Sequence, residues 1–184
     1  MKQEKRQHYE RALTTTILNS WSQYGQTIIS GGTNDIRFGI AISMNSDGTI
    51  IAVGADLGFS TRGSVLVYRY DARTWIQLGT TMKGSSGSEF GKRVSMNGAG
   101  DVLAVGAPSD GQNGCCRVYS YDGADWVQVG NDMCGLQANE RFAFRVGLSG
   151  ESTTINAIVA FGSTFWNNKR GQVSAYSYDA GTDS

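Results

Sequence analysis

The residues that come closest to a catalytic pattern are three carboxylates, Asp35, Glu89 and Glu140, each placed shortly before a phenylalanine. Two carboxyl groups roughly 5 to 10 Å apart can act as acid and base, or acid and nucleophile, in glycoside hydrolysis. Here the carboxylates precede their phenylalanines by three, one and two residues. Because this offset changes from one to the next, we expect solvated loop charges and no ring of catalytic groups.

Other residue types give no support for an enzyme. The sequence contains no nucleophile elbow, phosphate-binding loop, HExxH motif or paired-cysteine zinc motif. Its one histidine, His8, lies in the N-terminal segment. Cys115, Cys116 and Cys134 form neither a paired disulfide framework nor a spaced metal motif, so we expect buried or half-buried thiols on strands. The sequence therefore predicts a protein that is not an enzyme.

The composition predicts an all-β fold in a chain long enough to bury a core. Its 184 residues include 25 glycines, one proline and 10% aromatic residues, which is typical of short strands and tight turns. The 16 basic residues balance the 16 acidic ones, so no overall field favours nucleic acid or an anionic membrane. No apolar run approaches the roughly 18 to 20 residues of a membrane helix. We expect neither nucleic-acid binding nor membrane insertion.

Four landmarks recur in the same order at intervals of about 50 residues, which is the signature of a repeat architecture. They are Phe38-Gly39, Phe90-Gly91 and Phe142-Ala143; Val53-Gly54-Ala55, Val105-Gly106-Ala107 and Val159-Ala160-Phe161; a Tyr-x-Tyr-Asp sequence beginning at 68, 119 and 176; and WSQYG, WIQLG and WVQVG beginning at 21, 75 and 126. Four coincident series of this kind indicate three copies of one structural unit.

Each unit reads as four antiparallel strands joined by tight turns. In the second unit, apolar residues alternate or cluster over 92–96, 102–106, 117–121 and 126–130, with glycine-containing turns at 97–100 and 121–123. The second strands carry apolar residues on both faces, for example Ile50, Ile51 and Val53. A single such unit cannot cover two faces by itself, so units of this kind stack as blades of a propeller.

The sequence thus predicts a β-propeller segment of about three four-stranded antiparallel blades over residues 20–184. The blades span about 38–87, 90–138 and 142–179, with 21–29 as an offset outer strand. Residues 1–19 precede them as a helical or disordered leader. The small Gly-Ala pairs allow close approach of blades near the axis. The recurring tryptophans Trp75 and Trp126 are expected to pack between blades.

Phe-Gly, a turn, Val-Gly-Ala-Pro and an aromatic strand together resemble the FG-GAP repeat, which forms the blades of the integrin α-chain propeller. The likeness covers Trp21 to Asp179 and is strongest in the second unit, whereas the third unit keeps the spacing of the motif but not its residue types. The resemblance implies a ligand-binding or adhesion scaffold, usually of seven blades, that is extracellular or on the cell surface. Residues 1–18 nevertheless lack the apolar core of a signal peptide.

The resemblance also implies calcium in the turn between the first two strands of a blade. A calcium ion needs six to eight oxygen ligands, supplied by carboxylates and amides at alternate positions. The turn from Met44 to Ile50 holds Asp47-Gly48 but an apolar residue where a later carboxylate belongs, and the turns at 97–101 and 149–152 are poorer. We therefore expect plain hairpin turns and no cofactor.

Candidate binding residues lie in the loops between the second and third strands, at 56–63, 108–114 and 162–171, which vary while the strands repeat. Aromatic and cationic side chains in such loops form contact hot spots. The candidates for contact with a protein or glycan ligand are Phe59, Arg62, Asp110, Trp166, Lys169 and Arg170. Two alternatives stay open: a fragment of a propeller glycosidase or lyase that uses loop carboxylates, and a purely structural array in which these aromatics only cap blade edges.

Three blades are too few to close a ring, because propellers have about four to eight. The sequence starts with a fourth-strand pattern and ends after a third-strand pattern. We expect further blades to come from the same gene product, with head-to-tail assembly of identical chains as the alternative.

Overall fold

The computed structural model describes residues 21–30, 36–150, 157–165, 167 and 170–178. In this part the chain is all-β, with twelve strands in three antiparallel sheets and one short helix, α2 (Gly58–Thr61). None of the described helical residues belongs to a helix long and apolar enough to cross a membrane. The expected leader at 1–19, His8 and Asp35 lie outside the described residues.

Each sheet is formed by consecutive strands. Sheet 1 contains β1 (Ala41–Met44), β2 (Ile50–Ala55), β3 (Ser64–Asp71) and β4 (Thr74–Gln77), and the short β5 (Met82–Lys83) also pairs with β3. Sheet 2 contains β6 (Arg93–Met96), β7 (Val102–Ala107), β8 (Cys115–Tyr121) and β9 (Trp126–Cys134). Sheet 3 contains β10 (Arg145–Leu148), β11 (Ile158–Ser163) and β12 (Gln172–Ser177). The strands expected in the second unit are confirmed to within two residues, apart from a longer end of β9.

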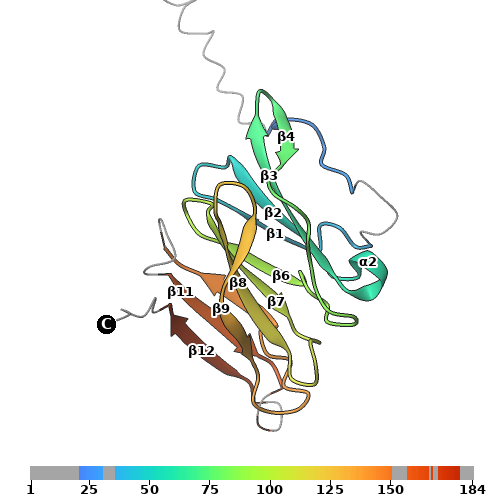
Figure 1. The fold of residues 1–184 in the computed structure, drawn as a ribbon, viewed down its shortest axis with the longest axis vertical. Coiled ribbons are helices and arrows are strands. Elements are labelled where there is room, and N and C mark those ends of the chain that lie inside the picture. The colour runs from blue at the N-terminus through green and yellow to red at the C-terminus, as the bar shows by residue number, and fades with distance from the viewer. Residues whose placement is uncertain (1–20, 31–35, 151–156, 166, 168–169, 179–184) are drawn as a thin grey trace, which may run out of the picture.

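Sheet 2 is covered on both faces. Figure 1 shows the three sheets in sequence order, and the inner strands β1, β6 and β10 contact one another in that order. Phe90, Val65 and Leu103 belong to the core between sheets 1 and 2. Phe142 and Phe161 belong to the core between sheets 2 and 3. All six residues of β7 are buried, as expected for a strand with neighbours on both sides.

The contact between sheets 1 and 2 is repeated between sheets 2 and 3. Ser43 Oγ accepts a hydrogen bond from Met96 N, and Ser95 Oγ accepts one from Leu148 N, both at 2.9 Å. The turns that follow these strands are also linked in series, because Ser46 N donates to Gly98 O and the amide of Gly98 donates to Gly150 O, again at 2.9 Å. The same relation between neighbours therefore occurs twice.

Glycine allows the sheets to approach closely near the ends of the second strands β2 and β7. A Cβ atom added to Gly54 would overlap the carbonyl oxygen of Gly91 in the next sheet, and one added to Gly106 would lie 2.5 Å from the carbonyl oxygen of Ala143. These are the Gly-Ala landmarks of the sequence. The sheets could not approach to this distance with any larger residue at these positions.

Trp126 packs between sheets 1 and 2, as expected, whereas Trp75 packs against residues 21–30, which form no sheet in the described part of the chain. Trp126 Nε1 donates a hydrogen bond to Leu78 O at 3.1 Å, and Trp75 Nε1 donates one to Tyr24 O at 3.2 Å. Tyr24 also stacks on Tyr70, with ring centroids 4.0 Å apart. Residues 21–30 therefore lie against sheet 1 in the way that the end of β4 lies against sheet 2.

The cysteines differ from the expectation. Cys115 and Cys134 form a disulfide across β8 and β9, whereas Cys116 is a free, buried cysteine. A β-bulge between Cys116 and Val118 shifts the strand register, and this shift sets Cys115 opposite Cys134. Without it, Cys115 would lie opposite Asp132. The prediction of thiols at Cys115 and Cys134 was therefore wrong, and that of a buried thiol at Cys116 is confirmed.

A candidate binding rim with an arginine cluster

The loops between second and third strands share one rim with the segments that join the sheets. Gly87 N donates to Thr61 O at 3.0 Å, and Asn139 N donates to Gln112 O at 2.7 Å. At the third loop, Phe165 N donates to Glu140 O at 3.2 Å. The loops of sheets 1 and 2 are each bonded to the segment that leads from their own sheet to the next one, and the loop of sheet 3 is bonded to the segment that joins sheets 2 and 3. These bonds give the rim a fixed shape.

A solvent-open groove of about 700 Å³ runs along this rim. Its lining is mostly polar and includes the side chains of Gln112, Gln137 and Asn139 beside Arg141 and the exposed ring of Phe165. The guanidinium of Arg141 lies 5.9 Å from the centroid of Phe165. Amide side chains next to an aromatic ring can accept and donate hydrogen bonds while the ring supplies apolar contact.

Glu89 lies in a partly buried ionic network at the edge of the groove. It accepts hydrogen bonds from Lys92 Nζ and, at 2.6 Å, from Ser109 Oγ, and its Oε2 lies 3.3 Å from Arg141 Nη2. Burial alone would raise the pKa of Glu89, but the hydrogen bonds from Lys92 and Ser109 outweigh it and lower the pKa. A carboxyl group with a lowered pKa is a poor proton donor near neutral pH. The expectation that Glu89 is a simple solvated loop charge was wrong.

Glu140 is a fully buried structural carboxylate. Its Oε2 accepts hydrogen bonds from Leu136 N at 2.9 Å and Gln137 N at 3.0 Å, while Oε1 accepts one from Gln172 Nε2 at 2.9 Å. These bonds hold the segment that joins sheets 2 and 3. The expectation of a solvated charge was therefore wrong here as well, because the side chain satisfies backbone amides that burial removes from water.

An arginine cluster borders the groove on the side of the inner strands. Arg93 and Arg145 occupy the same repeat position, and each donates Nη1 to the carbonyl of its preceding residue, at 2.6 and 2.9 Å. The guanidinium carbons of Arg93, Arg141 and Arg145 lie 5.2, 4.8 and 4.8 Å from the ring centroid of Phe144. These four residues are called the arginine cluster below.

Two members of the cluster have no directly paired carboxylate among the described residues, although the charges of Asp56 and Glu89 act on Arg93 from a distance. Within the described part of the chain, neither Arg93 nor Arg145 forms an ion pair with a carboxylate, whereas Arg141 pairs with Glu89. The pKa of Arg93 is lowered by burial and by the neighbouring charge of Arg145. Like charges held together in this way favour an anion between or beside them.

The structure does not bring all the sequence candidates together. Arg62 and Arg170 are exposed rim residues, and Phe59 lies in α2. The carboxylate of Asp110 already has partners within the chain, because it pairs with Arg117 at 2.6 Å and accepts a hydrogen bond from Ser85. The remaining two candidates, Trp166 and Lys169, lie outside the described residues.

Sequence reasoning missed the arginine cluster, although a signal for it exists. Arg93 and Arg145 each stand three residues after the phenylalanine of an FG-type landmark, in FGKR and FAFR. Arg141 and Phe144 flank the second of these landmarks. The shared position of the two arginines in successive units is visible in the sequence and marks them as equivalent residues.

The hairpin turns and the cysteines offer no open oxygen or sulfur set for a metal ion in the described residues. Asn97 Oδ1 accepts hydrogen bonds from the amides of residues 100–102, and Asn45 Oδ1 from those of residues 49 and 50. Cys115, Asp132 and Cys134 lie within 4.8 Å of one another, but the two sulfurs are bonded together. Asp132 accepts hydrogen bonds from Arg117, so its carboxylate is already paired.

A scan against protein-family models finds no match for the chain, and a search of curated proteins finds none.

Proposed function

We propose that the chain is a set of FG-GAP-type propeller blades that acts as a non-enzymatic binding module. Two observations support this architecture: the identical serine-to-amide bonds between successive sheets, and the tryptophan that donates to the carbonyl of the preceding unit in both cases. A constant relation between neighbouring sheets is what rotation about a common axis requires. The disulfide supports an oxidising compartment, such as the cell surface or the extracellular space.

The ligand that the rim fits best is an acidic glycan, bound with its anionic group on the arginine cluster and its hydroxyl groups along the groove. The observation that carries this proposal is the pair Arg93 and Arg145, which meets at Phe144 without a carboxylate partner among the described residues. Guanidinium groups form paired hydrogen bonds with carboxylates and sulfates. The amide side chains of Gln112, Gln137 and Asn139 continue from there along the groove.

Binding to immobilised oligosaccharides tests this proposal. The probes are a sulfated heparin hexasaccharide, a carboxylated hyaluronan hexasaccharide and a neutral desulfated, carboxyl-reduced hexasaccharide. Arg145→Gln and Arg93→Gln are each expected to weaken binding of an acidic probe about tenfold or more, because a charge-assisted hydrogen bond contributes about 1.5 to 3 kcal/mol. Arg73→Gln removes the same charge at the exposed turn between β3 and β4 and is expected to have no effect.

Equal binding of acidic and neutral probes, or equal loss in the Arg73→Gln control, would refute the acidic-glycan proposal. If an acidic peptide binds and no glycan does, the ligand is a protein segment. The enzymatic alternative predicts release of products from the same polysaccharides and its loss in Glu89→Gln. The lowered pKa of Glu89 and the enclosure of Glu140 support the non-enzymatic proposal.

A further inference from the structure

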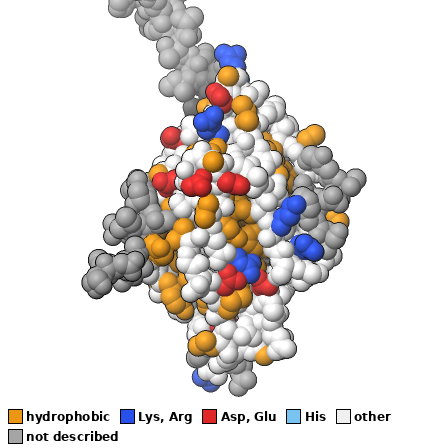
Figure 2. All heavy atoms as spheres, in the orientation of Figure 1, with side chains coloured by type: hydrophobic (Ala, Val, Ile, Leu, Met, Phe, Trp, Pro, Cys, Tyr) orange, Lys and Arg blue, Asp and Glu red, His pale blue; other side chains and the backbone are white. Residues whose placement is uncertain are grey.

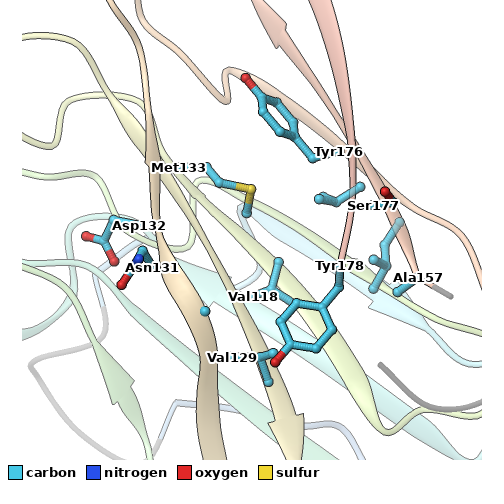
Figure 3. Close-up of a pocket in the computed structure, with 12 residues that line it drawn as sticks. Val118, Val129, Asn131, Asp132, Met133, Ala157, Tyr176, Ser177 and Tyr178 are labelled. Carbon is cyan, nitrogen blue, oxygen red and sulfur yellow. The ribbon is translucent and has the colours of Figure 1, made fainter. Parts of the chain in front are cut away.

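An apolar pocket of about 240 Å³ lies between sheets 2 and 3, away from the rim groove. Figure 3 shows Tyr176 and Tyr178 on the β12 side of this pocket and Val118, Val129 and Met133 on the side of β8 and β9. In the space-filling view, apolar side chains are exposed in this part of the molecule (Figure 2). An engineered cavity of roughly 150 Å³ holds a benzene ring. The pocket is therefore large enough for a two-ring indole.

The repeat shows what occupies this position in the other units. In the first, the indole of Trp75 lies between Tyr70, at a ring-centroid distance of 5.1 Å, and Gly25, whose added Cβ would be 3.1 Å from Trp75 Nε1. The glycine has a φ of 76°, which keeps a side chain out of the space that the indole fills. Tyrosine, tryptophan and the glycine of the preceding unit thus form one packed group.

The second unit contains the same group. The indole of Trp126 lies between Tyr121, at a ring-centroid distance of 5.5 Å, and Gly79, whose added Cβ would be 2.9 Å from Trp126 Cδ1. The φ of Gly79 is 75°. The glycine belongs to the WxQxG sequence of one unit and the tryptophan to that of the next. Each WxQxG sequence therefore supplies a tryptophan that packs on the preceding unit and a glycine against which the next tryptophan packs.

The third group lacks its tryptophan in the described residues. Gly130 has the same conformation, with a φ of 69°, and Tyr178 stands where Tyr70 and Tyr121 stand in their units. The nearest atom to a Cβ added at Gly130 is Tyr178 Cε2, at 3.8 Å. The pocket is lined by Gly130, Tyr178 and Val129. Val129 is the repeat counterpart of Tyr24 and Leu78, whose carbonyl oxygens accept the indole hydrogen bond in the other two groups. The pocket therefore lies where the other two units hold a tryptophan, and it is called the socket below.

The chain itself contains a matching occupant. Trp21 begins the remaining WxQxG sequence, WSQYG, and its side chain is 105% exposed. The rest of this segment is already in place, because Tyr24 and Gly25 contact Trp75 of the same chain. Tyr24 and Gly25 are therefore held against sheet 1, whereas Trp21 has no preceding sheet on which to pack among the described residues.

We propose that Trp21 of a second copy of this chain fills the socket, with its segment 21–25 pairing along the edge of β12 that faces no other strand in the described part of the chain. This contact continues the established interface between successive sheets, because the second copy's sheet 1 would follow sheet 3 as sheet 2 follows sheet 1. Two such contacts, one at each junction, close a ring of six blades, within the range of about four to eight that propellers adopt. The proposal rests on the blade architecture of the proposed function but is independent of the ligand at the rim.

Light scattering on the purified full chain tests this proposal. The wild type is expected to have twice the mass of 19.8 kDa, and Trp21→Ala is expected to return it to 19.8 kDa. Leu136→Ala is the matched control, because Leu136 is a similarly exposed apolar residue (91%) outside the socket, and this variant keeps the doubled mass. The side chain of Trp21 is fully exposed, so its removal is expected to leave the fold intact.

A peptide experiment identifies the socket. The peptide of residues 21–29 is expected to bind to the Trp21→Ala chain in a calorimetric titration, whereas the same peptide with alanine for tryptophan is not. A wild type that stays at 19.8 kDa up to its solubility limit, or a dimer that survives Trp21→Ala, overturns the proposal. A wild type that stays monomeric yet binds the peptide also overturns it, because its socket then takes a strand from another protein and not from a second copy. If the Trp21→Ala monomer still binds the acidic glycan, the rim proposal stands even when the dimer proposal fails.

Discussion

Replacement of Gly54 by alanine tests whether the sheets stack face to face as closely as the structure indicates. Gly54 lies in β2, and its missing side chain faces the Gly91 carbonyl at the start of sheet 2. An added methyl group would overlap that oxygen, so the two sheets must move apart. The atom that obstructs the methyl group belongs to the backbone of a buried segment, which cannot rotate away as a side chain could.

The expected cost follows from the severity of this overlap. Overpacking a core by a methylene group costs typically about 1 to 3 kcal/mol and occasionally more. Because the obstruction at Gly54 is backbone, we expect a loss of about 3 kcal/mol or more, which corresponds to a fall in Tm of roughly 6 to 12 °C for a chain of this length. Gly106→Ala is expected to cost less, because its Cβ would lie 2.5 Å from Ala143 O.

Gly147 provides the matched control. It lies in β10, no atom comes within 4 Å of an added Cβ, and its φ is not positive. Gly147→Ala is expected to be neutral or to stabilise by about 0.4 to 1 kcal/mol, because alanine restricts the unfolded chain. Thermal unfolding followed by circular dichroism ranks the three variants. If Gly54→Ala is as stable as Gly147→Ala, the close stacking of sheets 1 and 2 is wrong.

Three further predictions concern stability. Glu140→Gln is expected to cost about 1 to 3 kcal/mol in urea unfolding, because an amide NH₂ would face one of the donors that now bind the carboxylate; an unchanged urea midpoint would show that those donors find other acceptors. Replacing Cys115 and Cys134 by serine is expected to cost about 2 to 4 kcal/mol, and the native wild type should expose no reactive thiol while the unfolded, unreduced chain titrates with one; two or three thiols would contradict the disulfide. Burial alone would raise the pKa of Asp132, but hydrogen bonds from Arg117 and Gln128 lower it, so this pair stabilises the fold above about pH 4 and the contribution is lost as pH falls through the lower folded pKa. Asp132→Asn should therefore lose less stability than the wild type between neutral pH and pH 3, and parallel pH profiles would refute this.

The repeat made the strands predictable. Polar–apolar alternation located β6, and a continuous apolar run bounded by glycine turns located β7, each to within two residues. The aromatic alternation of Tyr119 and Tyr121 located β8 in the same way. The WxQxG motif located the contacts of Trp75 and Trp126, since a large aromatic residue that recurs with the scaffold is best explained by packing. Local patterns of this kind are sufficient wherever neighbouring units bury the same residues.

The candidate site was less predictable, because it depends on which residues the sheets bring together. The bulge that pairs Cys115 with Cys134 shifts the register by two residues, and Gly130, with a φ of 69°, lies at the step in β9. A single glycine in a strand pattern can indicate a bulge but does not determine which residues lie opposite each other beyond it. The burial of Glu140 depends on Gln172, which is far along the chain. Arg93 and Arg145 meet only because two inner strands stack, so their shared position indicates equivalence but not contact.

A crystal structure of the chain is the most direct test of the central claim that one relation between neighbouring sheets is repeated around an axis. We expect that the rotation that superposes sheet 1 on sheet 2 also superposes sheet 2 on sheet 3, and that the indoles of Trp75 and Trp126 each lie against a glycine of the preceding unit. Two unequal rotations, or a tryptophan that packs within its own sheet, would contradict it.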